Sequence, residues 1–264
     1  MKVRVISALI AIIIAIPFIF LGGYFYSFGI GVLAVVAFTE ILKLKKSHSK
    51  IPKIPSVIAL AAMLSLVYTS FEGDTTIYGL AYAMLILMIV ALVLPIIIYK
   101  KDKYTSKDAL YLIGVALFLG IIFHSFITVR EKGLETFFYL VLIPVCTDTS
   151  AYMIGCKIGK HKMAPKISPN KSWEGTIAGL ILGTILPCIF YALVVRSFTI
   201  SIVFITLVLS AIGQIGDLIF SKIKRENEIK DFSNLMPGHG GVLDRLDSTS
   251  FIFMTYLFLT TFLL

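Results

Sequence analysis

The chain has 264 residues, of which 58% are hydrophobic and 15% are charged, and its formal net charge is +9. This apolar content excludes a soluble domain of ordinary composition and indicates a membrane protein. The basic residues are scattered over short loops with few aromatic side chains between them, which argues against nucleic-acid binding. The three cysteines lie in or at the ends of apolar segments without metal-site spacing, so they predict neither a disulfide framework nor a zinc site: Cys146, Cys156 and Cys188.

Apolar blocks of about 17 to 23 residues alternate with polar loops along the whole chain, and this is the length that a helix needs to cross a bilayer. The predicted fold class is therefore all-α, a polytopic integral membrane protein with about nine transmembrane helices. The predicted spans are 5–21, 25–42, 55–71, 77–99, 108–128, 134–155, 175–195, 199–220 and 248–264. No A-x-A-like cleavage site closes the first block, so it is expected to be retained as an anchor.

The loop charges predict the orientation, because Lys and Arg accumulate on the cytoplasmic side of short loops. A cytoplasmic N-terminus places all but three of the 24 Lys and Arg residues inside, the exceptions being Arg130, Lys132 and Arg196. With nine spans the C-terminus is then expected outside.

The two halves of the chain differ in the residues that interrupt their apolar blocks. Residues 1–133 are predicted to be an N-terminal scaffold of transmembrane helices. Within them, Glu40 and His124 lie close enough to span ends for snorkelling or an interhelical hydrogen bond to accommodate them. Residues 134–264 are predicted to hold the functional site, with cytoplasmic loops at 156–174 and 221–247.

Two carboxylates lie inside apolar segments of the second half, Asp148 and Asp217. A carboxylate in a membrane helix is costly unless it faces protein, water or a cation, so each marks a functional site. At about 100° per residue, Ser221 and Lys224 share the helix face of Asp217. One face is therefore expected to carry a carboxylate, a hydroxyl and an ammonium group.

The loop 221–247 combines acidic, basic and glycine residues. Asp244 and Asp247 are three residues apart and can share a face at the start of the last span, so carboxylates from two helix ends can converge on one cation. The sequence PGHGG, Pro237–Gly241, permits an anion nest of successive N–H groups, and His239 can donate to a phosphate or transfer a proton. Nearby basic residues favour the nest over a plain surface turn: Lys224, Arg225, Lys230 and Arg245.

The loop 156–174 is a second candidate phosphate-binding surface, with five lysines and the only tryptophan of the chain. Its candidates for substrate contact are Asn170 and Lys171. Gly155–Lys160 falls short of a P-loop, because three rather than four residues separate its glycines and no Ser or Thr follows the Lys. Ser172 is expected to cap a helix that begins at Trp173, which either anchors that helix at the interface or contacts substrate.

Three stretches of the second half resemble the phosphatidate cytidylyltransferase family, the CDP-diacylglycerol synthases of the CdsA type. They are Cys146–Gly179, Gly213–Arg225 and the long signature S-x-I-K-R-x4-K-D-x-S-x2-M-P-x-H-G-G-V-x-D-R-L-D at Ser221–Asp247. Met236 stands where that family more often has Leu, Ile or Phe, which is a conservative exchange. The first half is similar only in its apolar character and the placement of its spans.

The resemblance implies a transfer of CMP from CTP to phosphatidic acid, with Mg²⁺ and a possible second cation as cofactors, giving CDP-diacylglycerol and pyrophosphate. It also implies a homodimer in the bacterial cytoplasmic (inner) membrane, in contact with membrane lipid and with its site facing the cytoplasm. The implied metal ligands are Asp217 and Asp244 as first choices, with Asp247 and Asp148 next. The other catalytic candidates are Lys224, Arg225 and His239, and the substrate-binding candidates are Ser221, Lys230, Asp231, Gly240, Gly241, Arg245, Asn170 and Lys171.

The residue types suit this chemistry on independent grounds, since nucleotidyl transfer needs charge neutralisation and positioning more than covalent catalysis. An anionic lipid phosphate needs no strong base to attack the α-phosphorus of CTP in line. One alternative is a secondary transporter, which is disfavoured because the charges cluster at one membrane face and no inverted repeat is visible. Another is a lipid-alcohol kinase. A CDP-alcohol phosphotransferase is disfavoured because its D-G-x2-A-R pattern is absent.

Overall fold

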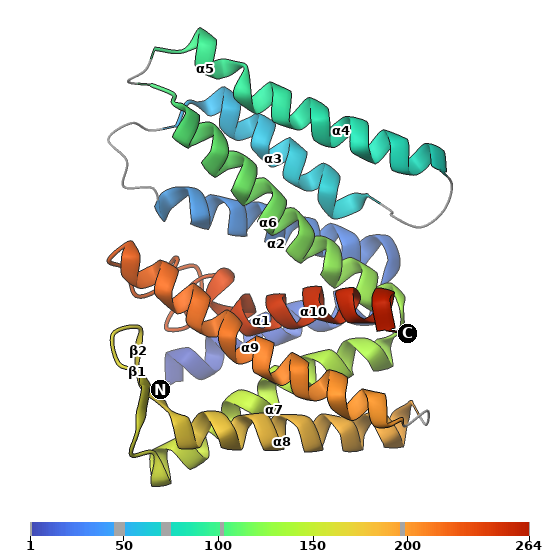
Figure 1. Ribbon diagram of the computed structural model, residues 1–264, viewed down its shortest axis with the longest axis vertical. Coiled ribbons are helices and arrows are strands. Elements are labelled where there is room, and N and C mark those ends of the chain that lie inside the picture. The colour runs from blue at the N-terminus through green and yellow to red at the C-terminus, as the bar shows by residue number, and fades with distance from the viewer. Residues whose placement is uncertain (1, 45–50, 70–74, 101–102, 196–198, 264) are drawn as a thin grey trace. The chain divides into compact units, whose positions relative to one another are not determined.

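The computed structural model describes residues 2–44, 51–69, 75–100, 103–195 and 199–263 (Figure 1). Within these ranges nine long helices correspond one to one with the nine predicted spans. They are α1 (Lys2–Leu21), α2 (Gly23–Leu44), α3 (Lys53–Tyr68), α4 (Thr75–Val93), α6 (Ser106–Glu131), α7 (Leu134–Ile158), α8 (Trp173–Val194), α9 (Ile200–Glu226) and α10 (Leu243–Leu263). The short helix α5 (Pro95–Ile98) divides the fourth predicted span, because proline lacks the N–H that a continuing helix would need.

The apolar helices confirm the all-α, polytopic membrane class. Among the described residues, five helices are long and apolar enough to cross a membrane, namely α2, α6, α7, α8 and α9, and shorter apolar helices accompany them. The orientation stays a prediction. Several residues of the charge argument lie outside the described ranges: Lys45, Lys46, Lys50, Lys101 and Arg196.

The chain divides into two compact units, one formed by residues 24–127 and the other by residues 1–23 together with 128–264. The first helix therefore belongs to the same compact unit as the C-terminal helices. The division into a scaffold of residues 1–133 and a functional half stays a prediction. One contact that holds it there is the hydrogen bond from Arg130 Nε to the carbonyl of Ile19, at 2.7 Å. The Arg130 side chain near the end of α6 thus holds the end of α1 through this hydrogen bond.

The unit of residues 24–127 is an apolar helical assembly with a few satisfied polar groups. Tyr111 donates to the carbonyl of Ile41 at 2.8 Å. His124 Nδ1 lies 3.3 Å from the carbonyl of Val67 on α3, which is the interhelical contact predicted for this histidine. These two contacts join helices of the unit through single polar groups.

In the other unit, small residues let the helices approach one another closely. Gly175, Gly179 and Gly183 recur every four residues along α8 and face α7. A Cβ atom at Gly175 would lie 2.6 Å from the carbonyl oxygen of Ala151, and one at Gly179 would lie 2.8 Å from that of Thr147. Such backbone-to-backbone packing is typical of membrane helices.

Hydroxyl groups add polar links inside this unit. Tyr139 and Thr206 are 2.7 Å apart, and Thr147 and Ser210 are 2.8 Å apart, so α7 is tied to α9 at two levels. All four side chains are buried. Hydrogen bonds between helices satisfy groups that lipid cannot solvate.

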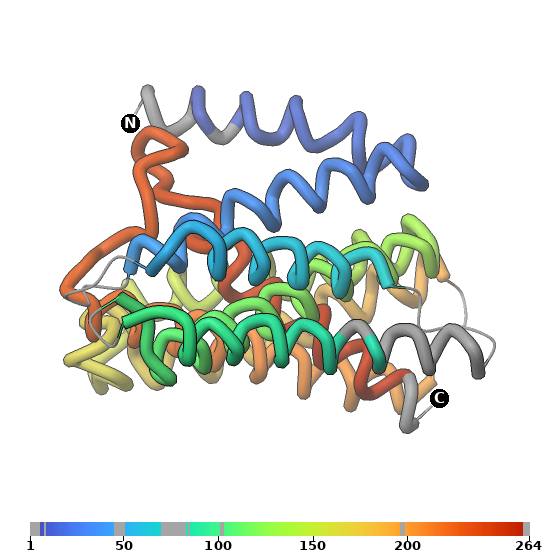
Figure 2. The backbone as a smooth tube through the Cα atoms, turned by 90° about the horizontal axis from the view of Figure 1, so that it is seen from above, coloured from blue at the N-terminus to red at the C-terminus, as the bar shows by residue number. Residues whose placement is uncertain are grey.

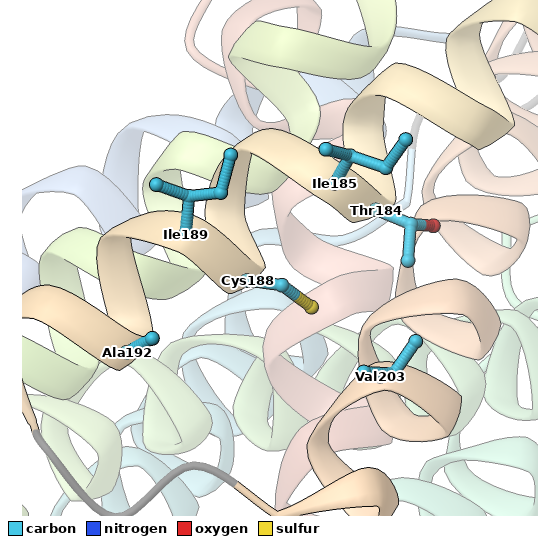
Figure 3. A pocket seen from close by; sticks show the side chains of 6 residues that line it. All are labelled: Thr184, Ile185, Cys188, Ile189, Ala192 and Val203. Atoms are coloured by element: carbon cyan, nitrogen blue, oxygen red, sulfur yellow. The ribbon is translucent and has the colours of Figure 1, made fainter.

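An apolar cavity of about 290 Å³ lies between α8 and α9 (Figure 3). Its lining consists of Thr184, Ile185, Cys188, Ile189, Ala192 and Val203. The Thr184 hydroxyl donates to the carbonyl of Leu180 at 2.7 Å, and the Cys188 thiol contacts Thr206 at 3.3 Å. With these polar atoms occupied, the cavity offers apolar contact only and holds no catalytic group.

Candidate active site

The loop 156–174 folds into a small hairpin that the sequence analysis did not predict. Strands β1 (Lys162–Ala164) and β2 (Ser168–Ser172) are antiparallel, with Lys162 opposite Ser172 and Ala164 opposite Ser168. At the end of β2, the Ser172 hydroxyl accepts from the N–H of Gly175 at 3.3 Å, so Ser172 is the N-cap of α8 as predicted. The hairpin thereby fixes residue 171 directly before a helix start.

A carboxylate at that helix start closes the base of the hairpin. Glu174 precedes the predicted span 175–195, and its side chain lies 2.6 Å from the ring of His161. The pKa of Glu174 is lowered to about 2, first by its own backbone N–H and then by the ring and backbone N–H groups of His161. The side chain is therefore a stable anion that holds the two ends of the hairpin together.

The first ion pair of the site joins this hairpin to α9. Lys171 Nζ lies 2.6 Å from Asp217 Oδ2, and the two side chains are 23% and 25% exposed. Ser221 donates to Asp217 Oδ1 at 3.3 Å, as expected from their shared helix face. Arg225 adds a second link, from its Nε to the carbonyl of Ile167 at 3.4 Å. The two polar loops predicted from the sequence therefore meet at α9.

The second ion pair is buried and joins α9 to α10. Lys224 Nζ donates to Asp244 Oδ1 at 2.7 Å, with side chains 11% and 2% exposed. Asp244 Oδ2 accepts from the N–H of Phe232 at 2.7 Å and from the N–H of Gly241 at 2.9 Å. An ionised carboxylate offers about four acceptor positions, so about one remains on Asp244. The Asp244 carboxylate therefore holds the loop between α9 and α10 through two backbone N–H groups of that loop.

Phe232 anchors the same loop in the helices. Its buried ring meets Phe220 edge-on, with centroids 5.7 Å apart, and Lys224 Nζ lies 5.4 Å from the centre of the Phe232 ring. The aromatic contact and the Asp244 carboxylate thus both hold the loop against the helices.

The PGHGG segment is a tight turn whose N–H groups have internal partners. The N–H groups of His239 and Gly240 both donate to the carbonyl of Met236, at 2.9 and 3.1 Å, and that of Gly241 donates to Asp244. Gly238 and Gly240 have φ values of +78° and +85°, which glycine adopts without strain. An anion nest would have to compete with these bonds. The prediction that Gly240 and Gly241 contact substrate stays a prediction.

Gly240→Ala is expected to loosen this turn and lower the thermal unfolding temperature. An alanine at positive φ costs about 1–2 kcal/mol, and the new Cβ would lie 2.7 Å from Asp244 Oδ2. Gly23→Ala is a matched control, since its φ is +48° and a Cβ there would meet nothing within 4 Å. An equal loss of stability in the two variants would show that the clash with Asp244 has no effect.

Two further carboxylates, Asp148 and Asp247, lie near Asp217. Asp148 on α7 interacts electrostatically with Asp217 and with Lys171, and Asp247 on α10 interacts with Asp217 and, more weakly, with Asp148. Asp148 is exposed although it lies well inside α7. Within the described residues no three His, Cys, Asp or Glu side chains form a ready-made metal site. Asp148, Asp217 and Asp247 therefore lie within electrostatic range of one another, and Asp244 lies three residues before Asp247 on α10.

Comparison with known proteins identifies the family of the chain. The model of the cytidylyltransferase family matches residues 2–263. The chain belongs to the cytidylyltransferase family. Similar proteins include the phosphatidate cytidylyltransferase of Staphylococcus haemolyticus, which is 35% identical over 253 residues covering 96% of both chains. That of Bacillus subtilis is 34% identical over 260 residues, covering 96% of this chain and 94% of the relative. The similarity noted in the C-terminal half thus extends along the whole cytidylyltransferase.

The remaining predicted residues of this cytidylyltransferase lie on its surface near the two ion pairs. Arg225 donates from its Nη1 to the carbonyl of Ile229 at 3.1 Å, in addition to its bond with the hairpin. The other exposed members of the predicted set are Asn170, Lys230, Asp231 and Arg245. Their side chains are accessible to a dissolved anion, and their predicted contact with substrate stays a prediction.

One contact of the cytidylyltransferase site comes from a residue that the sequence analysis missed. The Ser7 hydroxyl on α1 lies 2.8 Å from His239 Nδ1 and donates to the carbonyl of Pro237 at 3.0 Å. Ser7 is one hydroxyl in an apolar run assigned to scaffold, and no local pattern links it to a turn 230 residues away. Only the fold brings the two together.

Proposed function

We propose that this cytidylyltransferase transfers CMP from CTP to phosphatidic acid, giving CDP-diacylglycerol and pyrophosphate. The observation that carries the proposal is the meeting of the Lys171–Asp217 pair with the carboxylates of Asp148 and Asp247 where α9 joins the polar loops. Cations and carboxylates together serve phosphate groups and their metal ions. The names of the relatives support phosphatidate as the acceptor.

The proposed reaction is a direct in-line displacement. A phosphate oxygen of phosphatidate attacks the α-phosphorus of CTP, a new P–O–P bond forms, and the bond to the β-phosphate breaks as pyrophosphate leaves. The attacking phosphate is already anionic, so the protein need not remove a proton. Lys171 and the exposed basic residues Arg225, Lys230 and Arg245 are placed to neutralise phosphate oxygens during this step.

Mg²⁺ fits the carboxylates of this chain. The ion prefers oxygen ligands and is commonly held by one or two carboxylates together with substrate phosphates. Asp148, Asp217 and Asp247 supply such oxygens within electrostatic range of one another. We propose Asp217 and Asp247 as its first ligands, with Asp148 beside them and Asp244 limited to its remaining acceptor position. A second cation would share the same carboxylates. Bound there, the metal would supply positive charge for the departing pyrophosphate.

The lipid side of the proposal rests on the surroundings of Lys171. Trp173 follows it by two residues and is 51% exposed, as suits an aromatic side chain at headgroup depth. From there α8 continues as an apolar span. A phosphate near Lys171 would therefore have its acyl chains beside the membrane-facing part of the protein. A homodimer in the bacterial cytoplasmic membrane, with the site facing the cytoplasm, belongs to the same proposal.

The substrate requirement tests this proposal. Purified protein in detergent is expected to release pyrophosphate only when CTP, phosphatidate and Mg²⁺ are all present, and removal of the metal with a chelator should abolish release until Mg²⁺ is restored. Diacylglycerol in place of phosphatidate should give no product. A phosphorylated lipid formed from diacylglycerol would instead identify a lipid-alcohol kinase.

A further inference from the structure

The contact between α1 and the PGHGG turn fixes the orientation of the His239 ring as well as the position of the turn. In Figure 2 the coloured N-terminal half of α1 passes the loop that precedes α10. There the Ser7 hydroxyl meets two groups of the same turn, the carbonyl of Pro237 at 3.0 Å and the ring of His239 at 2.8 Å. These two groups flank Gly238, whose φ of +78° bends the chain between them. The Ser7 hydroxyl therefore fixes the orientation of the His239 ring relative to the backbone of the PGHGG turn.

The donor and acceptor roles in this contact follow from counting hydrogens. A serine hydroxyl has one hydrogen, and a carbonyl oxygen can only accept, so the bond to Pro237 requires that the Ser7 hydrogen point to that carbonyl. The bond between Ser7 Oγ and His239 Nδ1 must then take its hydrogen from the ring. A neutral imidazole carries one N–H, so this network assigns it to Nδ1 and leaves Nε2 unprotonated.

We propose that Ser7 is a positioning residue that holds neutral His239 as its Nδ1–H tautomer and thereby reserves Nε2 for proton exchange. Uptake of a proton at Nε2 changes the ring from acceptor to charged donor without breaking its bond to Ser7. Neutral His239 can accept a hydrogen bond at Nε2, and only the protonated ring can donate one to a phosphate oxygen from that atom. The Nδ1 atom is unavailable for either role.

The tautomer can be observed without any enzymatic assay. In NMR spectra of protein labelled with ¹⁵N-histidine, the correlations between ring nitrogens and ring hydrogens differ between the two neutral tautomers. The chain has four histidines, and the signal that disappears in His239→Gln belongs to His239. We expect the Nδ1–H pattern in the wild type and in Ser7→Thr, and a changed tautomer mixture in Ser7→Ala. Ser56→Ala removes a hydroxyl that donates to the carbonyl of Pro52 and should leave the pattern unchanged. An Nε2–H pattern for neutral His239 in the wild type would overturn the proposal.

The effect on turnover rests on the proposed function and is measured separately. Loss of one hydrogen bond to the ring should lower turnover by about tenfold in Ser7→Ala, and Ser7→Thr should restore it. In a His239→Gln background the Ser7→Ala change should have no further effect, because Ser7 acts through that ring. A further loss there would show that Ser7 acts on the fold instead. An Nδ1–H signal in a protein without cytidylyl transfer would sustain the tautomer and refute the proposed function.

Discussion

Asp244→Asn is expected to give a protein that is both inactive and markedly less stable. The substitution turns an amide group toward Lys224, whose buried ammonium then lacks a counter-charge. Removing one partner of a buried ion pair costs about 3–5 kcal/mol. The loop N–H groups of Phe232 and Gly241 both donate to Asp244 Oδ2, so an amide oxygen at that position keeps both bonds and leaves the amide NH₂ group facing Lys224. Thermal unfolding in detergent and pyrophosphate release measure the two effects.

A double variant separates the structural part of this effect from the chemical part. Adding Lys224→Met to Asp244→Asn removes the uncompensated charge, while the amide oxygen can still accept from the loop N–H groups. We expect most of the lost stability to return and activity to stay absent. Equal unfolding temperatures for Asp244→Asn and the wild type would contradict the structural role assigned to the buried pair.

Asp217→Asn should also lose activity, but it should keep the stability of the wild type. Its partner Lys171 and Asp217 itself are each about a quarter exposed, and ion pairs with such access to solvent contribute about 0–1 kcal/mol. The carboxylate is nevertheless our first choice as a metal ligand, and loss of one such electrostatic group costs on the order of 10²–10³-fold in turnover. Turnover and unfolding temperature should be measured on the same preparation.

Glu226→Gln is the matched control, since it also replaces a carboxylate of α9 by an amide. Glu226 pairs with Lys222 at 3.3 Å, and both side chains are more than half exposed. Neither stability nor turnover should change in this variant. Normal turnover in Asp217→Asn would refute the ligand assignment, and a large loss in Glu226→Gln would show that any α9 carboxylate has the same effect.

The helices could be predicted from the sequence because their signal is local. A run of apolar residues long enough to cross a bilayer appears in the chain itself, and so does the Ser172–Trp173 start of α8. The shared face of Asp217 and Ser221 follows from helical spacing alone. The bond between their side chains bears out that spacing argument.

The contacts that shape the site depend on distant parts of the chain. Nothing near Lys171 identifies Asp217 as its partner, and the pairing of Lys224 with Asp244 crosses a loop whose path is set by Phe232. The hairpin at 162–172 escaped prediction because its strands are short and carry polar residues without clear alternation. The placement of Ser7 at His239 follows only once α1 is known to join the C-terminal helices.

The fate of the phosphates of CTP tests the central claim most directly. Purified protein is incubated with phosphatidate, Mg²⁺ and CTP that carries a radiolabel on either the α- or the γ-phosphate, and the lipid and aqueous fractions are counted. We expect the α-label to enter the lipid and the γ-label to leave as pyrophosphate, with neither transferred by Asp217→Asn. Entry of the γ-label into lipid, or no phosphatidate-dependent cleavage of CTP by the folded wild type, would contradict the account.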